Sequence, residues 1–149
     1  MKYKKNLSFV IFKIDTPFNI NFLKEHQEII NTYGYTWLSK FGKSILKINN
    51  LLKTEHVIFI KDSKKNGNKI YIATYTEINN FRKSPYPEYY NNIKLISNIH
   101  FKITKIKEIS LDFMLKNFIG KTTSTNLNIF FKSITKAIYI TNINEIEIS

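Results

Sequence analysis

The sequence predicts an α+β fold in which helices pack on the outside of a curved mixed sheet or partial barrel. Three observations support this prediction. The chain has 149 residues, of which 43% are hydrophobic, enough for one core. Strand-like runs of β-branched and aromatic residues alternate with stretches in which apolar residues recur at helical spacing. With 4 Gly and 3 Pro, no stretch has the composition of a linker. We therefore expect residues 1–149 to form one domain.

The chain begins with a predicted strand and a predicted helix. Residues 8–15 are rich in β-branched and aromatic side chains on both faces, which is typical of a central strand. Pro17 ends this strand because it cannot donate to a sheet ladder. Apolar residues then recur at helical spacing over residues 19–32, and Asn19 or Asn21 is a suitable N-cap.

An aromatic turn, a short helix and a hairpin are expected next. Residues 33–43 contain two of the four glycines and the only tryptophan, and we predict a turn there. Ser44 is expected to cap a short helix that extends to Leu52. Strand-like runs at residues 55–61 and 69–78 flank Asn66-Gly67, which predicts a β-hairpin. In its second strand one face carries Tyr71, Ala73 and Tyr75, and the other carries Ile70, Ile72, Thr74 and Thr76.

The second half is predicted to contain a long aromatic loop and then five further segments. Residues 79–98 form the loop, and such long loops in small domains are usually functional or pack onto the core. The elements expected after it are a strand over residues 99–109 with a bulge near Lys105, a short helix capped by Ser110 and ended by Gly120, a polar loop over 121–126, helix then strand over 127–140, and an edge strand or frayed end over 142–149.

The net charge of +12 indicates an anionic partner, with nucleic acid the first candidate and an anionic membrane surface the second. No stretch approaches 18 uncharged apolar residues, and the apolar run that starts at Phe9 is interrupted by Lys13 and Asp15. We therefore expect neither a membrane-spanning segment nor a secretory leader, no membrane partner, and a cytoplasmic location.

The residues do not indicate catalysis, a metal site or a cofactor. With no cysteine, disulfides and thiolate chemistry are excluded. The three histidines lie on three different predicted elements, with no carboxylate at ligand spacing. Gly42-Lys43-Ser44 and Gly120-Lys121-Thr122 imitate the end of a phosphate-binding loop, but the required earlier glycine is replaced by Trp37 and Leu115.

Two groups of aromatic and cationic residues remain as candidates for binding. The first consists of Tyr35, Trp37, Lys40 and Lys43, and the second of Phe81, Arg82, Lys83, Tyr86, Tyr89 and Tyr90. If the groups converge, they would form walls around a stacked base, with the cations near its phosphates. The alternatives are that Trp37 is a core anchor, as a lone tryptophan in a small domain more often is, and that the tyrosines only cover the open end of the core.

The opening strand, the following helix and Tyr35-Thr36-Trp37-Leu38-Ser39 resemble the beginning of the PUA-like superfamily, in particular its YTH and EVE branch of modified-base readers. The hairpin and the strand, helix and polar loop that follow are similar in order to the rest of that fold. The resemblance implies a PUA-like fold in which Trp37 is one wall of an aromatic cage and Ser39 its polar neighbour. It also implies that Asp15 lies near the position that reads the base edge. The second wall would come from Tyr86, Tyr89 or Tyr90, because this loop has no tryptophan.

We therefore expect a non-catalytic domain that binds RNA or DNA and stacks a flipped or single-stranded base, methylated or unmodified. The expected phosphate contacts are Lys40, Lys43, Arg82 and Lys83. A second hypothesis is a small basic protein that binds an acidic protein, for example an inhibitor of a host defence complex encoded by a mobile element. A third, an RNA-processing enzyme, would need a cluster of His, Lys and carboxylate groups that the sequence does not display.

Overall fold

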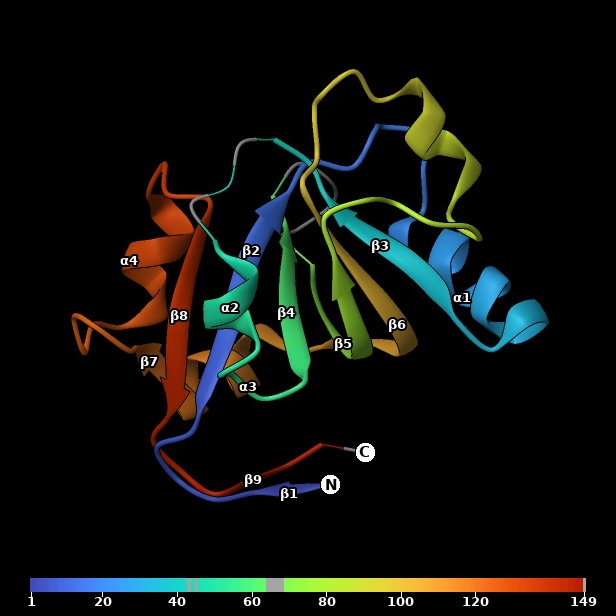
Figure 1. Ribbon diagram of the computed structural model, residues 1–149. Helices are drawn as coiled ribbons and strands as arrows, with labels where there is room; N and C mark the ends of the chain where they lie inside the picture. The colour runs from blue at the N-terminus through green and yellow to red at the C-terminus, as the bar shows by residue number, and fades with distance from the viewer. Residues whose placement is uncertain (43, 45, 64–68, 149) are drawn as a thin grey trace.

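The computed structural model describes residues 1–42, 44, 46–63 and 69–148 (Figure 1). The predicted α+β class is confirmed. In chain order the elements are β1 (Lys2–Tyr3), β2 (Ser8–Ile14), α1 (Phe22–Tyr33), β3 (Thr36–Lys40), α2 (Ile48–Leu51), β4 (Val57–Asp62), β5 (Ile70–Asn79), the 3-10 helix η1 (Glu88–Asn92), β6 (Ile99–Ile109), α3 (Leu111–Asn117), β7 (Phe118–Gly120), α4 (Leu127–Lys132), β8 (Ala137–Asn142) and β9 (Ile146–Glu147).

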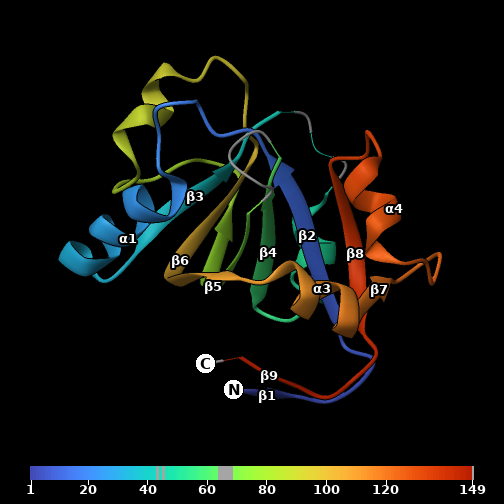
Figure 2. The same ribbon diagram turned by 180° about the vertical axis from the view of Figure 1, so that it is seen from behind.

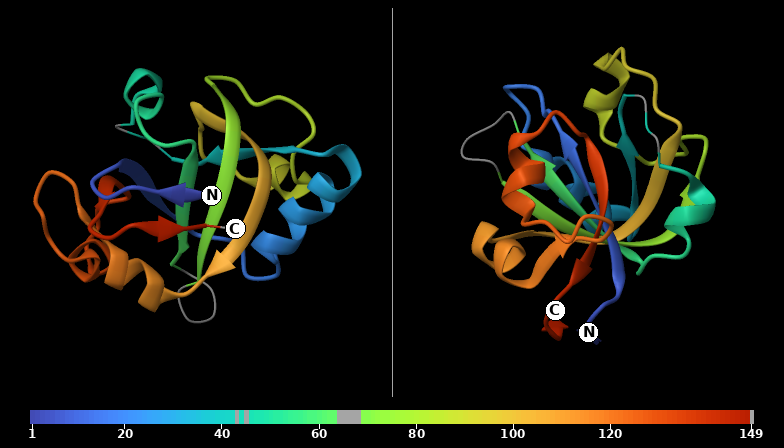
Figure 3. Two further views of the ribbon diagram at one scale, coloured as in Figure 1. Left: turned by 90° about the horizontal axis from the view of Figure 1, so that it is seen from below. Right: turned by 90° about the vertical axis from the view of Figure 1, so that its left-hand side faces the viewer.

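A seven-stranded sheet in the order β3-β6-β5-β4-β2-β8-β7 forms the centre of the molecule. It is a mixed sheet, because β2 runs parallel to β4 while the other neighbouring strands are antiparallel. The sheet is open and strongly curved, and helices lie on its outside (Figure 3). β1 and β9 pair separately, which places the two termini side by side.

Alternate residues of the central strands point into two separate apolar clusters. In β2, Val10 and Phe12 belong to one cluster, whereas Phe9 and Ile11 belong to the other. The first lies on the α2 side of the sheet, which faces the viewer in Figure 1. The second is covered by α3, β7 and α4, which come forward in Figure 2. This confirms the prediction of a central strand with two buried faces, and the two faces predicted for the second hairpin strand separate in the same way.

Two of the three N-caps that the sequence indicated are present, whereas the N-cap of α2 is Lys47 and not Ser44. The Asn21 side chain accepts a hydrogen bond from the Lys24 backbone N–H at the start of α1. Ser110 does the same for the N–H of Phe113 at the start of α3. Each bond satisfies a backbone donor that the helix itself leaves unpaired.

The aromatic segment around Trp37 is a strand and not the predicted turn. Gly34 ends α1 with φ 85°, and Gly42 has φ 90° just after β3, so the glycines bracket a strand instead of interrupting it. Five of the residues between them, Thr36 to Lys40, pair with β6. The long-range partner strand therefore decided the conformation of this segment.

Other boundaries differ from the prediction in smaller ways. The second helix begins at Ile48 and not next to Ser44, and β7 occupies the segment where the sequence suggested a helix ending at Gly120. Ile45 and the Asn66-Gly67 turn lie outside the described residues. The strands that flank this turn pair as an antiparallel hairpin, as predicted. None of the helices in the described ranges is long and apolar enough to cross a membrane.

The later elements follow the sequence pattern closely. β6 covers residues 99–109 as expected, and the partners of Thr74 and Tyr75 skip from Lys105 to Ile103, which confirms the bulge. The long segment between β5 and β6 contains only the short η1. Residues 127–140 contain α4 and then β8, and β9 is the edge strand that the tail suggested.

Candidate functional site

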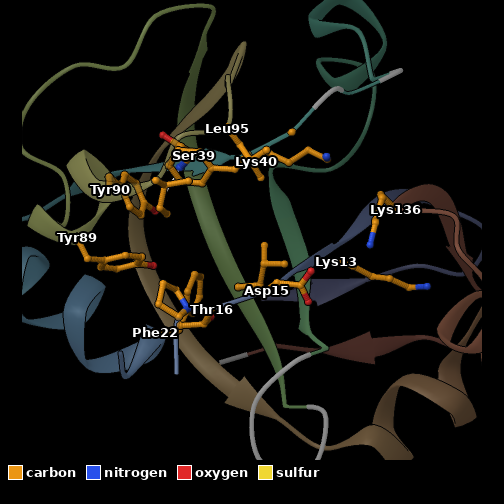
Figure 4. Close-up of a pocket in the computed structure, with 15 residues that line it drawn as sticks. Lys13, Asp15, Thr16, Phe22, Ser39, Lys40, Tyr89, Tyr90, Leu95 and Lys136 are labelled. Carbon is orange, nitrogen blue, oxygen red and sulfur yellow. Dashed lines mark hydrogen bonds between the residues drawn. The ribbon is translucent and has the colours of Figure 1, made fainter. Parts of the chain in front are cut away.

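A pocket of about 530 Å³ lies where β2 and β3 end, and we call it the strand-end pocket. It is closed by η1, by the segment between η1 and β6, and by Lys136 just before β8. Figure 4 shows two unlike sides. The aromatic side chains of Phe22, Tyr89 and Tyr90 lie on one side, and those of Asp15, Lys40 and Lys136 lie on the other.

The residues that follow β2 and β3 explain why both strands end at the pocket. Pro17 follows β2 and prevents the strand from continuing. β3 ends at Lys40, and Gly42 turns the chain with a left-handed conformation. Its N–H donates to the Ile96 carbonyl at 2.9 Å, and the Ser97 hydroxyl donates to the Lys40 carbonyl at 2.6 Å. These bonds fix the wall of the pocket to the end of β3.

The aromatic side is held by a chain of buried hydrogen bonds. His26 Nδ1 lies 2.7 Å from the Phe22 carbonyl, which can only accept, so Nδ1 carries the proton and Nε2 accepts from the Tyr90 hydroxyl at 2.5 Å. The Tyr90 oxygen in turn accepts the Ser39 backbone N–H at 3.3 Å. Tyr90 is 2% exposed, so its hydroxyl positions the ring and is not free for a ligand.

A second histidine anchors Ser39 from the other side. His100 Nε2 lies 3.2 Å from the Ser97 carbonyl and therefore donates to it. His100 Nδ1 then accepts the proton of the Ser39 hydroxyl at 2.7 Å. Both ring nitrogens of His26 and of His100 are thus committed to internal hydrogen bonds, and the Ser39 hydroxyl is as well.

Burial shifts the ionisation of these groups toward their neutral forms. Loss of solvation lowers the pKa of His26 to about 4, against a smaller opposite effect of its bond to the Phe22 carbonyl. Burial also raises the pKa of Tyr89 and of Tyr90 well above the ordinary range. At neutral pH the aromatic wall is therefore uncharged.

Two buried groups that line the pocket have no hydrogen-bond partner in the part of the chain that the structure describes. Lys40 is 2% exposed and lines the pocket, and its ammonium forms no hydrogen bond or salt bridge with any described residue. Burial, followed by the positive charge of Lys136, lowers the pKa of Lys40. Thr16 is 3% exposed, and within the described ranges its Oγ1 has no hydrogen-bond partner.

Lys13 lines the same pocket but is used differently. Its Nζ donates to the carbonyls of Phe130 and Ser133 at 2.6 and 2.7 Å, and it lies 4.5 Å from the centre of the Phe130 ring. These contacts fix the ammonium at the end of α4, where the helix dipole favours a cation. Lys13 is therefore a structural lysine, in contrast to Lys40.

The structure brings five of the residues singled out in the sequence together around the strand-end pocket. These are Asp15, Ser39, Lys40, Tyr89 and Tyr90. They come from the end of β2, from β3 and from η1, three segments far apart in the chain. The two groups predicted to converge thus meet in part, through Lys40 of the first group and Tyr89 and Tyr90 of the second.

Trp37 is the main correction to the predicted site. Its side chain is 2% exposed and does not line the pocket, so the indole is not an open wall for a ligand. On β3 it points away from Leu38, and the loop after β5 covers it. The backbone N–H of Trp37 donates to the Pro85 carbonyl at 2.9 Å, and Lys83 Nζ lies 5.8 Å from the centre of the indole ring. Trp37 therefore has the environment of a buried anchor, which was the alternative interpretation from the sequence.

The other described residues of the predicted site, which are Tyr35, Arg82, Lys83 and Tyr86, also lie outside the pocket. Tyr35 is half-buried beneath Lys102, whose Nζ lies 4.4 Å from the ring centre. Tyr86 stacks on the outer face of Tyr90 with ring centres 6.0 Å apart, and Arg82 covers Tyr86 at 4.3 Å. Lys43 lies outside the described residues.

Sequence reasoning did not single out the other residues that line the pocket. Four of them are Thr16, Phe22, Phe41 and Lys136. Phe41 directly follows Lys40, and Thr16 marks the end of β2, so both had a local signal. Phe22 looked like any apolar position of a helix, and Lys136 lay in a stretch where helix and strand were hard to separate. Only the fold brings these four side chains to one place.

The described part of the chain contains no group of three or more His, Asp or Glu side chains placed to hold a metal ion. Comparison of the chain with protein-family models, curated proteins and solved structures found no match.

Proposed function

We propose that this protein is a non-catalytic nucleic-acid-binding domain that accepts one base of a single strand, or one flipped base, in the strand-end pocket. The observation that carries the proposal is the pocket itself, which has an aromatic side and a lysine side and a volume of about 530 Å³. Pockets of about 300–1,000 Å³ suit small-molecule ligands. The net charge of +12 favours approach of a polyanion.

In this proposal Tyr89 and Phe41 take the stacking role first expected of Trp37. Both are half-buried and line the pocket, so each ring is partly accessible to a ligand. Stacking of a base on an aromatic side chain contributes about 1–3 kcal/mol. The engagement of His26 and His100 in internal bonds supports a binding role over acid–base catalysis.

We also propose that the fold is PUA-like, of the YTH and EVE type, and that the protein acts in the cytoplasm. The order of elements supports the fold assignment: a central strand, a helix, a strand with a Trp-x-Ser sequence, a hairpin, and a strand followed by a short helix. Whether the bound base is methylated, and whether it belongs to RNA or DNA, are questions for the binding experiment.

The decisive experiment measures binding of labelled single- and double-stranded RNA and DNA oligonucleotides, with and without methylated bases, to Tyr89→Ala. We expect affinity to fall about 5- to 150-fold, which corresponds to the loss of one stacked ring. Tyr35→Ala is the matched control, because Tyr35 is also half-buried but lies outside the pocket. Normal binding by Tyr89→Ala, in a variant that melts as a folded protein, would refute the proposal.

A second candidate function, binding of an acidic protein, is favoured by exposed apolar residues next to the pocket segments. Phe18, Ile96 and Ile134 are 90%, 84% and 94% exposed. Phe18 follows Pro17, Ile96 follows Leu95, and Ile134 precedes Lys136 by two positions. Pro17, Leu95 and Lys136 all line the pocket. Recovery of one protein partner that survives nuclease treatment, and its loss in Ile96→Asp, would favour this alternative.

A further inference from the structure

Lys40 is a buried cation whose ammonium has no stabilising contact that the described residues account for. β3 directs its side chain to the same face as Leu38, in the first apolar cluster, yet the residue lines the strand-end pocket. In the described part of the chain its ammonium has neither a hydrogen bond nor a salt bridge. Lys13, which lines the same pocket, shows how this fold supports a buried ammonium when it is structural: two carbonyls accept its protons. Among the described residues, Lys40 has no such acceptors.

Two more residues that line the pocket could bind an anion. Lys136 is exposed, and Figure 4 shows its side chain on the same side of the pocket as Lys40. The positive charge of Lys136 contributes to lowering the pKa of Lys40, so the two ammonium groups repel each other. Thr16 is buried beside Phe22, and its Oγ1 lacks a partner among the described residues.

The carboxylate of Asp15 lines the pocket but does not neutralise these lysines. Within the described ranges Asp15 forms no salt bridge with Lys40 or with Lys136. An anion would supply what the three groups lack: a negative charge for both lysines and an acceptor for the Thr16 hydroxyl. Phosphate oxygens form charge-assisted bonds of this kind with lysine.

We propose that Lys40, Lys136 and Thr16 form a phosphate-binding subsite, so that the pocket takes a nucleotide with its ring against Tyr89 and its phosphate against the two lysines. This inference rests on the proposed function and specifies which part of the ligand enters which side. It implies that the nucleotide in the pocket is recognised together with its own phosphate, and that a nucleoside without phosphate is a poor ligand.

The test compares the four common nucleosides with their 5′-monophosphates as competitors of a labelled oligonucleotide, up to millimolar concentration. For the native chain we expect at least about tenfold tighter binding of the best monophosphate than of its nucleoside. In Lys40→Met this ratio should fall close to one, and in Thr16→Val it should fall several-fold. Lys116→Met is the control, because Lys116 is an exposed lysine on α3, at the other end of the sheet.

A thermal-shift measurement with inorganic phosphate tests the phosphate subsite without a nucleoside. Phosphate should raise the melting temperature of the native chain more than that of Lys40→Met. Lys40→Met is expected to fold, because it replaces an unpaired buried charge with an apolar chain of similar length. Lys40→Arg, which keeps the charge, should restore part of the phosphate preference.

The failure of this inference can be distinguished from that of the proposed function. Equal displacement by nucleoside and monophosphate, or a ratio unchanged in Lys40→Met, would overturn the phosphate subsite, as would displacement by neither. If Tyr89→Ala still weakens oligonucleotide binding in that case, the base pocket stands without it. Monophosphate binding that depends on Lys40, with no oligonucleotide binding, would instead support the subsite and reject the nucleic-acid proposal.

Discussion

The Tyr90 hydroxyl donates a hydrogen bond of 2.5 Å to Nε2 of His26, and both side chains are buried. The bond joins η1 to α1 across 64 positions of the sequence. Because the Tyr90 oxygen also accepts the Ser39 N–H, this one hydroxyl connects α1, β3 and η1, the three elements that support the aromatic side of the strand-end pocket. The neutral state of His26 is therefore a condition for the shape of the pocket.

Stability should depend on pH through His26. The pKa of this group is about 4 in the folded chain and 6.5 as an ordinary histidine, so the unfolded chain binds the proton first as pH falls. The free energy of unfolding should therefore decrease between pH 6.5 and about 4, by on the order of 3 kcal/mol, and level off below that range. Burial lowers the pKa of His100 as well, which adds a change of the same sign.

Denaturant unfolding at a series of pH values measures this effect. In His26→Gln the decrease attributable to His26 should disappear, although the variant is less stable at neutral pH. His56→Gln is the matched control, since it makes the same substitution at an exposed histidine. A His26→Gln variant with the same pH dependence as the native chain would contradict the assignment.

Trp37→Ala should lower the stability of the protein but leave the oligonucleotide affinity of the folded protein nearly unchanged. The indole is 2% exposed, so its removal leaves a cavity and should cost about 3–5 kcal/mol of unfolding free energy. The oligonucleotide affinity of the molecules that remain folded should change little, because Trp37 does not line the pocket. Calorimetric melting combined with binding measured well below the melting temperature separates the two effects. A fully stable Trp37→Ala that fails to bind would restore the indole as a ligand platform.

Lys13→Met tests the distinction between the two buried lysines. Removal of this ammonium leaves the Ser133 carbonyl without its bond and deletes the contact with the Phe130 ring, which should cost about 1–3 kcal/mol. The preference for monophosphate over nucleoside should persist, because the Lys13 Nζ is already occupied. Loss of that preference in Lys13→Met would mean that Lys13 acts on the ligand.

Asn142 should hold the N-terminal segment against β8. It is fully buried; its side-chain oxygen accepts the Leu7 N–H at 2.9 Å, and its amide donates to the carbonyls of Lys4 and Asn144. Asn142→Leu removes all three bonds and should cost about 2–3 kcal/mol. Amide exchange at Leu7 should accelerate more than exchange in the middle of β4. Unchanged protection at Leu7 would show that the segment is held by other contacts.

The sequence by itself determined the elements whose signals are local. The alternation of Phe9 to Phe12 predicted a strand buried on both faces, and Asn21 and Ser110 marked helix starts, because capping depends on residues three positions apart. The extra residue in β6 was visible as a shift of the apolar face near Lys105. The tyrosines of the long loop were identified as candidates, and two of them line the pocket.

Only the tertiary structure decided which aromatic residues face a ligand. The sequence offered both Trp37 and the tyrosines of the loop as walls and could not choose between them, since exposure depends on which loop covers which strand. Segment 82–86 covers Trp37, whereas η1 places Tyr89 at the pocket. The placement of Lys40 and Lys136 at one pocket was not visible in the sequence either, because 96 positions separate them and they meet only when β3 and β8 join one curved sheet. Local sequence sets conformation within a few residues, but burial and the spacing of charges are properties of the assembled chain.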